Sequence, residues 1–266
     1  GGLTELMEFD LHTHTTYSDG SLMHMMASAA EKQGLKEIGF ADHANVSQRK
    51  PMKQAKYNNG FNLDMTCERR EMAIENLREK RDITIYSGIE MDYDPRDENE
   101  IRKFLEKKNF DYTLGSVHNL ENTNVHIREY FKNKTRKSRE KLVQRYFEKL
   151  EKLIRSELFD IASHIDVFER NPQLQGFATR ENYEVIAEAF KNSETIPEIN
   201  AGRALRGLEE IHPTKEFREI LIEKGITFTT GTDSHQPRDI KKLNQHLDHR
   251  LEELDITPER PQTLRN

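Results

Sequence analysis

FDLHTH, residues 9–14, is a short strand pattern that ends in side chains able to hold a metal ion. Six later stretches repeat this combination of an apolar run and a potential ligand: IGFADH (38–43), ITIYSGIE (83–90), YTLGSVH (112–118), FDIASHID (159–166), IPEIN (196–200) and ITFTTGTDSH (226–235). Helical patterns lie between these stretches, and repeated strand–helix units predict a parallel sheet or a (β/α) barrel. In such barrels the functional side chains lie at the carboxyl ends of the strands. We therefore expect the ligands to converge at one mouth.

Length and composition fit one barrel domain over residues 1–266. The chain has 266 residues, and barrels of about 250 residues fold as single units. The net charge of -6 weighs against a nucleic-acid or anionic-membrane surface. The one cysteine, Cys67, excludes an intramolecular disulfide and suits a reducing compartment. No apolar run approaches the roughly 20 residues that span a bilayer, so we expect a cytoplasmic protein with no membrane partner.

Helical patterns fill the intervals between the predicted strands. The first begins near Ser21, a potential helix cap, and ends at Gly34. The others cover residues 68–81, 97–107, 134–158, 180–191 and 214–224. Residues 239–266 predict one short helix and a tail. Residues 45–64 (NVSQRKPMKQAKYNNGFNLD) have no clear periodicity and predict a long loop, which is either a lid over the mouth or a surface excursion.

Two pairs of potential ligands have a spacing of two residues. His12 and His14 are two apart on a predicted strand, so both imidazoles point to the same side and can bind one ion. Asp233 and His235 repeat this spacing with a carboxylate and an imidazole. That ligand combination suits borderline ions such as Zn²⁺, Mn²⁺ or Fe²⁺.

The other candidates occur singly at the ends of strands. Asp42 and His43 are adjacent and point to opposite sides, so only one can bind an ion directly, and we favour His43. A carboxylate at Glu90 can bridge two cations. Each candidate alone is more often a structural residue, but the joint pattern at six strand ends favours a metal centre. Asp19, His118 and His164 complete the set, whereas the remaining histidines have no strand before them and are interpreted as surface residues: His24, His126, His212, His246 and His249.

Taken in order, these stretches resemble the motifs of the PHP (polymerase and histidinol phosphatase) superfamily. The resemblance covers essentially the whole chain through DLHTHTTYSDG (10–20), ADH (41–43), GIEMDY (88–93), GSVH (115–118), SHID (163–166), EIN (198–200) and TDSH (232–235). Asp19, where several relatives carry a histidine, and the stretches GIEMDYDP and DYTLGSVH look most like the histidinol-phosphate phosphatase branch. The resemblance implies an α/β fold, a distorted (β/α)7 barrel with a metal site at the C-terminal ends of its strands.

The resemblance also implies a cluster of three divalent metal ions. One would bind His12, His14, Glu90 and Asp233; Glu90 would bridge to a second, held also by His118 and His164; and Asp19, His43 and His235 would hold the third. Glu90, Asp233 and His235 are the residues implied to take part in catalysis. Whether the ions are Zn²⁺, Mn²⁺ or Fe²⁺ stays open, since the same ligands serve all three.

A phosphate monoester also needs cations that bind its free oxygens, and arginine does this better than lysine. Arg170, Arg203 and Arg206 follow predicted strand ends and are candidates, with surface salt bridges as the alternative. Asp166 either supports a metal-bound histidine or binds a substrate amine. The basic run at 132–141 (KNKTRKSREK) either attracts a phosphorylated substrate or is the solvated start of a helix.

The function expected from this resemblance is the metal-dependent hydrolysis of L-histidinol phosphate to L-histidinol and phosphate, in histidine biosynthesis. One alternative is the same chemistry on another phosphate, such as a nucleotide, a phosphopeptide or a nucleic-acid end. The net negative charge makes nucleic acid the weakest of these. Another alternative is a non-catalytic metal-binding scaffold. Oligomeric state stays open.

Overall fold

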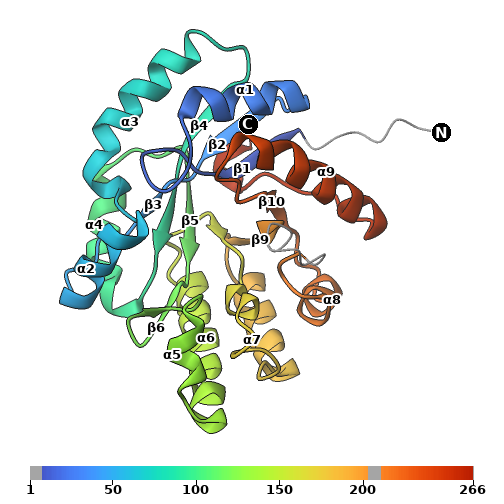
Figure 1. The fold of residues 1–266 in the computed structure, drawn as a ribbon. Coiled ribbons are helices and arrows are strands. Elements are labelled where there is room, and N and C mark those ends of the chain that lie inside the picture. The colour runs from blue at the N-terminus through green and yellow to red at the C-terminus, as the bar shows by residue number, and fades with distance from the viewer. Residues whose placement is uncertain (1–7, 203–210, 266) are drawn as a thin grey trace.

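A parallel sheet that nearly closes into a barrel of seven strands forms the centre of the protein. The structure is a computed structural model that describes residues 8–202 and 211–265 (Figure 1). In spatial order the strands are β1 (Phe9–Thr13), β2 (Glu37–Phe40), β4 (Thr84–Asp92), β5 (Tyr112–Ser116), β8 (Ile161–Ala162), β9 (Ile196–Asn200) and β10 (Thr229–Gly231). All neighbours are parallel. The short strand β3 (His43–Ala44) follows β2 in the sequence and pairs with the carboxyl-terminal part of β4, with His43 opposite Glu90. The predicted (β/α)7 barrel is confirmed.

The barrel closes between its first and last strands. The backbone nitrogen of His14 donates to Ser234 O over 2.9 Å, and that of Asp233 donates to His12 O over 2.8 Å. Both bonds lie at the carboxyl ends of β1 and β10: His12 is on β1, and His14, Asp233 and Ser234 follow the two strands. Residues from opposite ends of the sequence are thereby brought side by side at the mouth.

Helices cover the outside of the barrel, as Figure 1 shows. They are α1 (Met23–Gln33), α2 (Lys50–Asn59), α3 (Leu63–Arg78), α4 (Glu98–Lys107), α5 (Arg128–Lys132), α6 (Arg136–Arg155), α7 (Arg180–Lys191), α8 (Lys215–Glu223) and α9 (Pro237–Glu253). Short 3-10 turns occur at η1 (Pro95–Asp97), η2 (Val167–Arg170) and η4 (Gln262–Leu264), and β6 (Asn119–Leu120) pairs with β7 (Thr123–Asn124) in a hairpin. Within the described ranges no helix combines the length and apolarity needed to cross a membrane.

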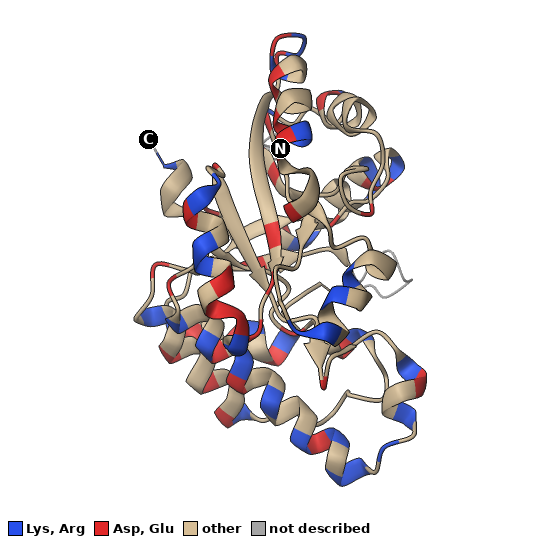
Figure 2. Ribbon diagram, turned by 90° about the vertical axis from the view of Figure 1, so that its left-hand side faces the viewer, with Lys and Arg blue, Asp and Glu red and all other residues tan. Residues whose placement is uncertain are grey.

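The helices carry both signs of charge along their length, which Figure 2 shows as interspersed blue and red segments. The basic run at 132–141 spans the end of α5 and the start of α6. Within it, Lys134 pairs with Glu121 at 3.0 Å. One lysine of the basic run is therefore engaged in a local ion pair.

One tyrosine fills the inside of the barrel below the mouth. Tyr112 is almost completely buried and donates its hydroxyl to Leu11 O across the barrel at 2.5 Å. Its ring occupies the space beside Gly39 and Gly88, where an added Cβ would lie 2.0 Å and 2.4 Å from atoms of Tyr112. Gly88 thus makes room for an aromatic ring in the core.

The structure differs from several sequence-based expectations. Residues 45–64 are not a loop throughout, because they contain α2. That helix buries little more than Met52 and Lys56, so it has no apolar stripe to reveal it. The last helix is not short: α9 has 17 residues and starts before Asp239, whose carboxylate accepts from the backbone of Gln236. Ser21 does not cap α1, since its hydroxyl donates to His235 O over 2.9 Å.

Candidate metal centre

The nine predicted metal-binding side chains lie together at the mouth of the barrel. Each sits at or just beyond the carboxyl end of a strand, where parallel strands bring their last residues into one ring. His12 is on β1 and is followed by His14 and, in the next turn, Asp19; His43 is on β3, Glu90 on β4, His118 follows β5, His164 follows β8, and Asp233 and His235 follow β10. All but Asp19 and His235 are buried.

Glu90 is the centre of this cluster. Its side chain has no exposed surface. Burial alone would raise its pKa, but the surrounding imidazoles, His43 foremost, hold the pKa of Glu90 well below its usual value. Its Oε1 lies 2.9 Å from His12 Nε2, 3.5 Å from His14 Nε2 and 3.3 Å from His43 Nδ1, and its Oε2 lies 3.1 Å from the Nε2 atoms of both His118 and His164. Its two oxygens therefore face two different groups of imidazoles, as a bridging carboxylate would.

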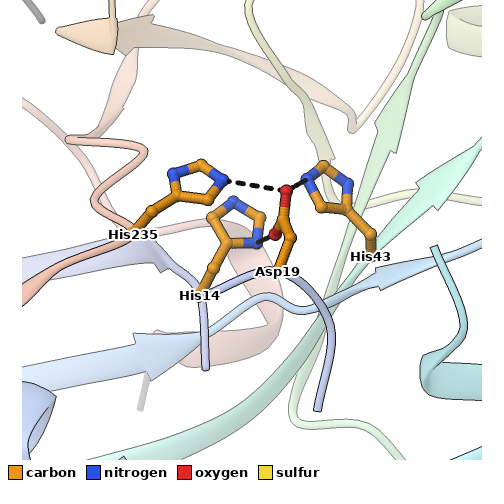
Figure 3. A group of neighbouring side chains, drawn as sticks. All are labelled: His14, Asp19, His43 and His235. Carbon is orange, nitrogen blue, oxygen red and sulfur yellow. Dashed lines mark ion pairs between the residues drawn. The ribbon is translucent and has the colours of Figure 1, made fainter. Parts of the chain in front are cut away.

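A second carboxylate, Asp19, is surrounded by three imidazoles on the open side of the mouth (Figure 3). Its Oδ2 lies 3.3 Å from His235 Nε2 and 3.7 Å from His43 Nε2, and its Oδ1 lies 3.7 Å from His14 Nδ1. The ring of His14 stacks with those of His43 and His235, with centroids 4.4 Å and 4.2 Å away. Donor atoms from three separate stretches of the chain, residues 14–19, His43 and His235, thus point at one another (Figure 3).

Three overlapping groups of donors have the spacing of metal sites, with all ligand atoms in each group within 4.8 Å of one another. One group is His12, His14, Glu90 and Asp233, which is the predicted first set. Another is His14, Asp19, His43 and His235, which contains the predicted third set. The remaining group is His43, Glu90 and His118; it has His43 in the place expected for His164, which contacts the same Glu90 oxygen as His118.

The chemistry of these groups fits divalent cations. Imidazole nitrogens and carboxylate oxygens are the usual ligands of Zn²⁺, Mn²⁺ and Fe²⁺. The buried Nδ1 atoms of His14, His43 and His164 have no hydrogen-bond partner among the described residues. Leaving a buried polar atom unsatisfied costs about 1–3 kcal/mol. Coordination at the cluster would satisfy the imidazole nitrogens that bind an ion and would neutralise the two buried carboxylates of Glu90 and Asp233.

Glu198 accepts a hydrogen bond from His12, one of the candidate metal-binding histidines. His12 Nδ1 donates to Glu198 Oε2 over 2.6 Å, while the other oxygen, Oε1, accepts from His164 N and from Asn200 Nδ2. A carboxylate in this position orients a metal-binding imidazole and raises its basicity. Gly231 is required beside it, because an added Cβ would lie 2.4 Å from His12 Cβ and 2.5 Å from Glu198 Oε2. The EIN motif is visible in the sequence, but the pairing of Glu198 with His12 is not.

Asp42 and Arg70 support the turn that carries Asp19. Asp42 is not among the clustered donors; its carboxylate accepts from Thr15 N, Thr15 Oγ1 and Ser18 Oγ at 2.6–2.7 Å. Behind it, the completely buried Arg70 donates to Asp42 Oδ2 over 3.1 Å and to Gly88 O over 2.6 Å. The choice of His43 over Asp42 as the candidate donor agrees with this placement.

Arg170 is the one predicted phosphate-binding arginine within the described residues. Arg203 and Arg206 lie outside the described ranges. Arg170 is buried at the edge of the cluster, with Nη2 3.4 Å from Asp233 Oδ2. Its Nε donates to His212, which in turn contacts Asp166. Burial lowers the pKa of His212 to about 4 despite that carboxylate. The interpretation of His212 as a surface residue is wrong, because its side chain has no exposed surface.

A cavity of about 350 Å³ opens above the cluster. Its wall includes Phe61, whose ring stacks on His43 with centroids 4.0 Å apart and lies 5.2 Å from the ring of His118. Segment 45–64 therefore folds back beside the donors. Lys56 ties this segment together by donating to Asn45 O and Asp64 Oδ2. Four further residues line the cavity and belong to none of the donor groups: Asn59, Asn124, His126 and Ile127.

Comparison with known proteins places these features in a family. The family model of the PHP domain matches residues 10–202. A "Probable histidinol-phosphatase" of Deinococcus radiodurans is 23% identical over 244 residues, which cover 90% of this chain and 89% of the relative. A "Histidinol-phosphatase" of Lactococcus lactis is 24% identical over 241 residues, covering 86% of this chain and 84% of the relative.

Solved structures share the fold over most of their length. The Lactococcus lactis histidinol phosphate phosphatase, complexed with zinc, L-histidinol and phosphate, has a TM-score of 0.76 and 22% identity, and 96% of each chain is covered. A putative histidinol phosphatase from Listeria monocytogenes has a TM-score of 0.73 and 21% identity, covering 87% of this chain and 97% of its own. At this identity the likeness establishes the barrel architecture.

Proposed function

The chain belongs to the PHP domain family, and on that premise we propose that it is a metal-dependent phosphatase that hydrolyses L-histidinol phosphate to L-histidinol and phosphate. The observation that carries the proposal is the buried Glu90, whose two oxygens face separate groups of imidazoles at the mouth of the barrel. The names of the curated relatives supply the substrate. A scaffold that no longer catalysed a reaction would not need this full set of donors beside a cavity.

We assign the donors to three divalent ions in the arrangement expected for the family. His12, His14, Glu90 and Asp233 would hold one ion, Glu90, His118 and His164 a second, and Asp19, His43 and His235 a third. When bound, such ions lower the pKa of water in the site and offset the charge of phosphate oxygens. Zinc is the ion named with the Lactococcus lactis structure and is the first to test.

The protein's own residues then have separate tasks. Arg170 binds the phosphate group, because its guanidinium lies at the edge of the same cavity as Asp233 and His235. Glu198 keeps His12 in the orientation in which Nε2 faces Glu90. Phe61 covers His43 and limits the access of water to that side of the cluster. The alcohol part of the substrate occupies the remaining wall, between Asn59 and Asn124.

A substrate panel tests the proposal. Protein reconstituted with Zn²⁺, Mn²⁺ or Fe²⁺ is offered L-histidinol phosphate, a nucleotide monophosphate, a phosphopeptide and an aryl phosphate, and phosphate release is measured. We expect a strong preference for L-histidinol phosphate. His118→Ala should lower kcat/KM by about 100-fold or more, because even residues that only orient metal ligands contribute about 10- to 100-fold. His249→Ala, at an exposed position on α9, is the matched control and should leave kcat/KM unchanged.

Each other outcome points to a specific alternative. Hydrolysis that depends on His118 but favours another phosphate would retain the metal centre and reject the substrate. No hydrolysis of any compound by fully reconstituted protein would favour the non-catalytic metal-binding scaffold.

A further inference from the structure

His212 is a buried histidine outside the donor cluster, and both of its ring nitrogens are hydrogen-bonded. Arg170 Nε lies 2.9 Å from His212 Nε2, and a guanidinium nitrogen can only donate. Nε2 of His212 therefore carries the lone pair, and the ring proton is on Nδ1. This Nδ1 donates to Asp166 Oδ1, at 2.5 Å. The contacts thus define one direction of donation, from Arg170 to His212 to Asp166.

The imidazole of His212 is held in place through the backbone on both sides. His212 N donates to Asn200 O over 2.9 Å, and Asn200 N donates to His212 O over 3.0 Å, at the end of β9. The second oxygen of Asp166 accepts from Thr214 N over 2.7 Å. Nε2 of His212 is therefore an acceptor at a fixed position.

This acceptor sets the direction of the Arg170 side chain. The guanidinium group is planar, so fixing Nε–H fixes the directions of both terminal nitrogens. Nη2 lies 3.3 Å from Asn200 Oδ1 and 3.4 Å from Asp233 Oδ2, both longer than the usual 2.7–3.2 Å of such bonds. Nη1 makes no hydrogen bond to the described residues. The 2.9 Å bond to His212 is thus the strongest constraint on the arginine.

We propose that His212 is a positioning residue for phosphate binding, an inference that rests on the proposed function. It accepts from Nε of Arg170 and so directs the terminal nitrogens of the guanidinium group at a phosphate oxygen in the cavity, without contacting the phosphate itself. Arginine binds phosphate as a rigid fork, so its direction matters as well as its charge. A displacement of about 1 Å at such a site can cost about 100-fold in rate.

Two substitutions separate the two hydrogen bonds of the imidazole. In His212→Gln the side-chain oxygen can take the place of Nε2 and accept from Arg170. In His212→Asn the side-chain N–H stays near the position of Nδ1 for Asp166, but the acceptor for Arg170 is gone. His249→Asn on α9 is the control, since its side chain is 70% exposed. Thermal unfolding and metal content are measured for every variant.

The first measurement is the affinity of each zinc-loaded protein for inorganic phosphate by titration calorimetry, and the second is kcat/KM for L-histidinol phosphate. We expect His212→Asn to weaken phosphate binding and to lower kcat/KM by about tenfold or more, the effect of losing one hydrogen bond to a charged group. His212→Gln should stay within about threefold of the wild type, and His249→Asn should match it.

A role in folding alone would affect both His212 variants alike. Equal losses in His212→Asn and His212→Gln, or unchanged phosphate affinity in His212→Asn, would overturn the inference, as would a wild-type protein that does not bind phosphate. Phosphate binding without hydrolysis would reject the proposed function and still decide the role of His212. In an Arg170→Lys background, which lacks the Nε–H donor, His212→Asn should have no further effect, and an additional loss there would also count against the inference.

Discussion

At the scale of single residues, the metal donors depend on buried groups that do not touch an ion. Asp42 and Arg70 both have completely buried side chains and form an ion pair at 3.1 Å beneath the turn that carries Asp19. Burial alone would raise the pKa of Asp42, but Arg70 and its hydrogen bonds hold that pKa below its usual value. The carboxylate is therefore ionised at neutral pH and compensates the charge of the arginine.

Replacing Asp42 by asparagine should strongly destabilise the protein. The substitution keeps the shape but leaves the charge of Arg70 buried and uncompensated, and breaking a buried pair in this way costs about 3–5 kcal/mol. The free energy of unfolding in urea measures the effect. Glu71→Gln is the matched control, because Glu71 is a half-exposed partner 3.8 Å from Arg70 and should contribute less than about 1 kcal/mol. Similar effects of the two substitutions would contradict this role of Asp42.

Residues at strand ends were predictable from sequence, whereas their supporting partners were not. His118 and His164 each end a short apolar run, and that local signal places them at the mouth. Glu198 pairs with a histidine 186 positions earlier, and His212 with an aspartate 46 positions earlier. No local pattern marks such pairs, so a partner far away in the sequence becomes visible only when the barrel closes.

At the scale of elements, α6 could be predicted from the sequence, whereas α2 could not. Helix α6 has Leu142, Tyr146 and Leu150 on one buried stripe, and its periodicity predicts it. Helix α2 has no such stripe, and the hairpin of β6 and β7 has only two residues in each strand. These short or polar elements supply Asn59 and Asn124 to the wall of the cavity, so the part of the site that we propose for the substrate alcohol is the part that periodicity reveals least.

Helix α2 should be less protected against hydrogen exchange than α3. It buries two side chains, whereas α3 buries five, and elements with few buried contacts open at lower free energy. Exchange followed by mass spectrometry should show faster deuterium uptake in residues 50–59 than in residues 63–78. Equal protection of the two helices would contradict the expectation that α2, with fewer buried side chains, opens at a lower free energy than α3.

At the scale of the whole molecule, the cluster joins residues on or after β1, β3, β4, β5, β8 and β10, so metal binding and stability should be linked. One ion at 100 times its Kd stabilises a folded state by about 2.7 kcal/mol, and each further ion adds to this. For a chain of this size, that raises Tm by roughly 5–10 °C. Scanning calorimetry on chelator-treated and reloaded protein measures the shift.

The variants of the substrate experiment serve as controls here too. His118→Ala should reduce the metal-dependent shift in Tm, and the exposed His249→Ala should not. A Tm that is the same with and without divalent ions would show that the buried donors do not bind them.

Phosphate release from L-histidinol phosphate by one sample in three states, zinc-loaded, chelator-treated and reloaded, tests the central claim most directly. The account predicts turnover that is lost on chelation and returns with the ions, because the donors around Glu90 and Asp19 have the chemistry and spacing of a metal site. Turnover that persists in fully metal-free protein, or no turnover in the loaded protein, would contradict it.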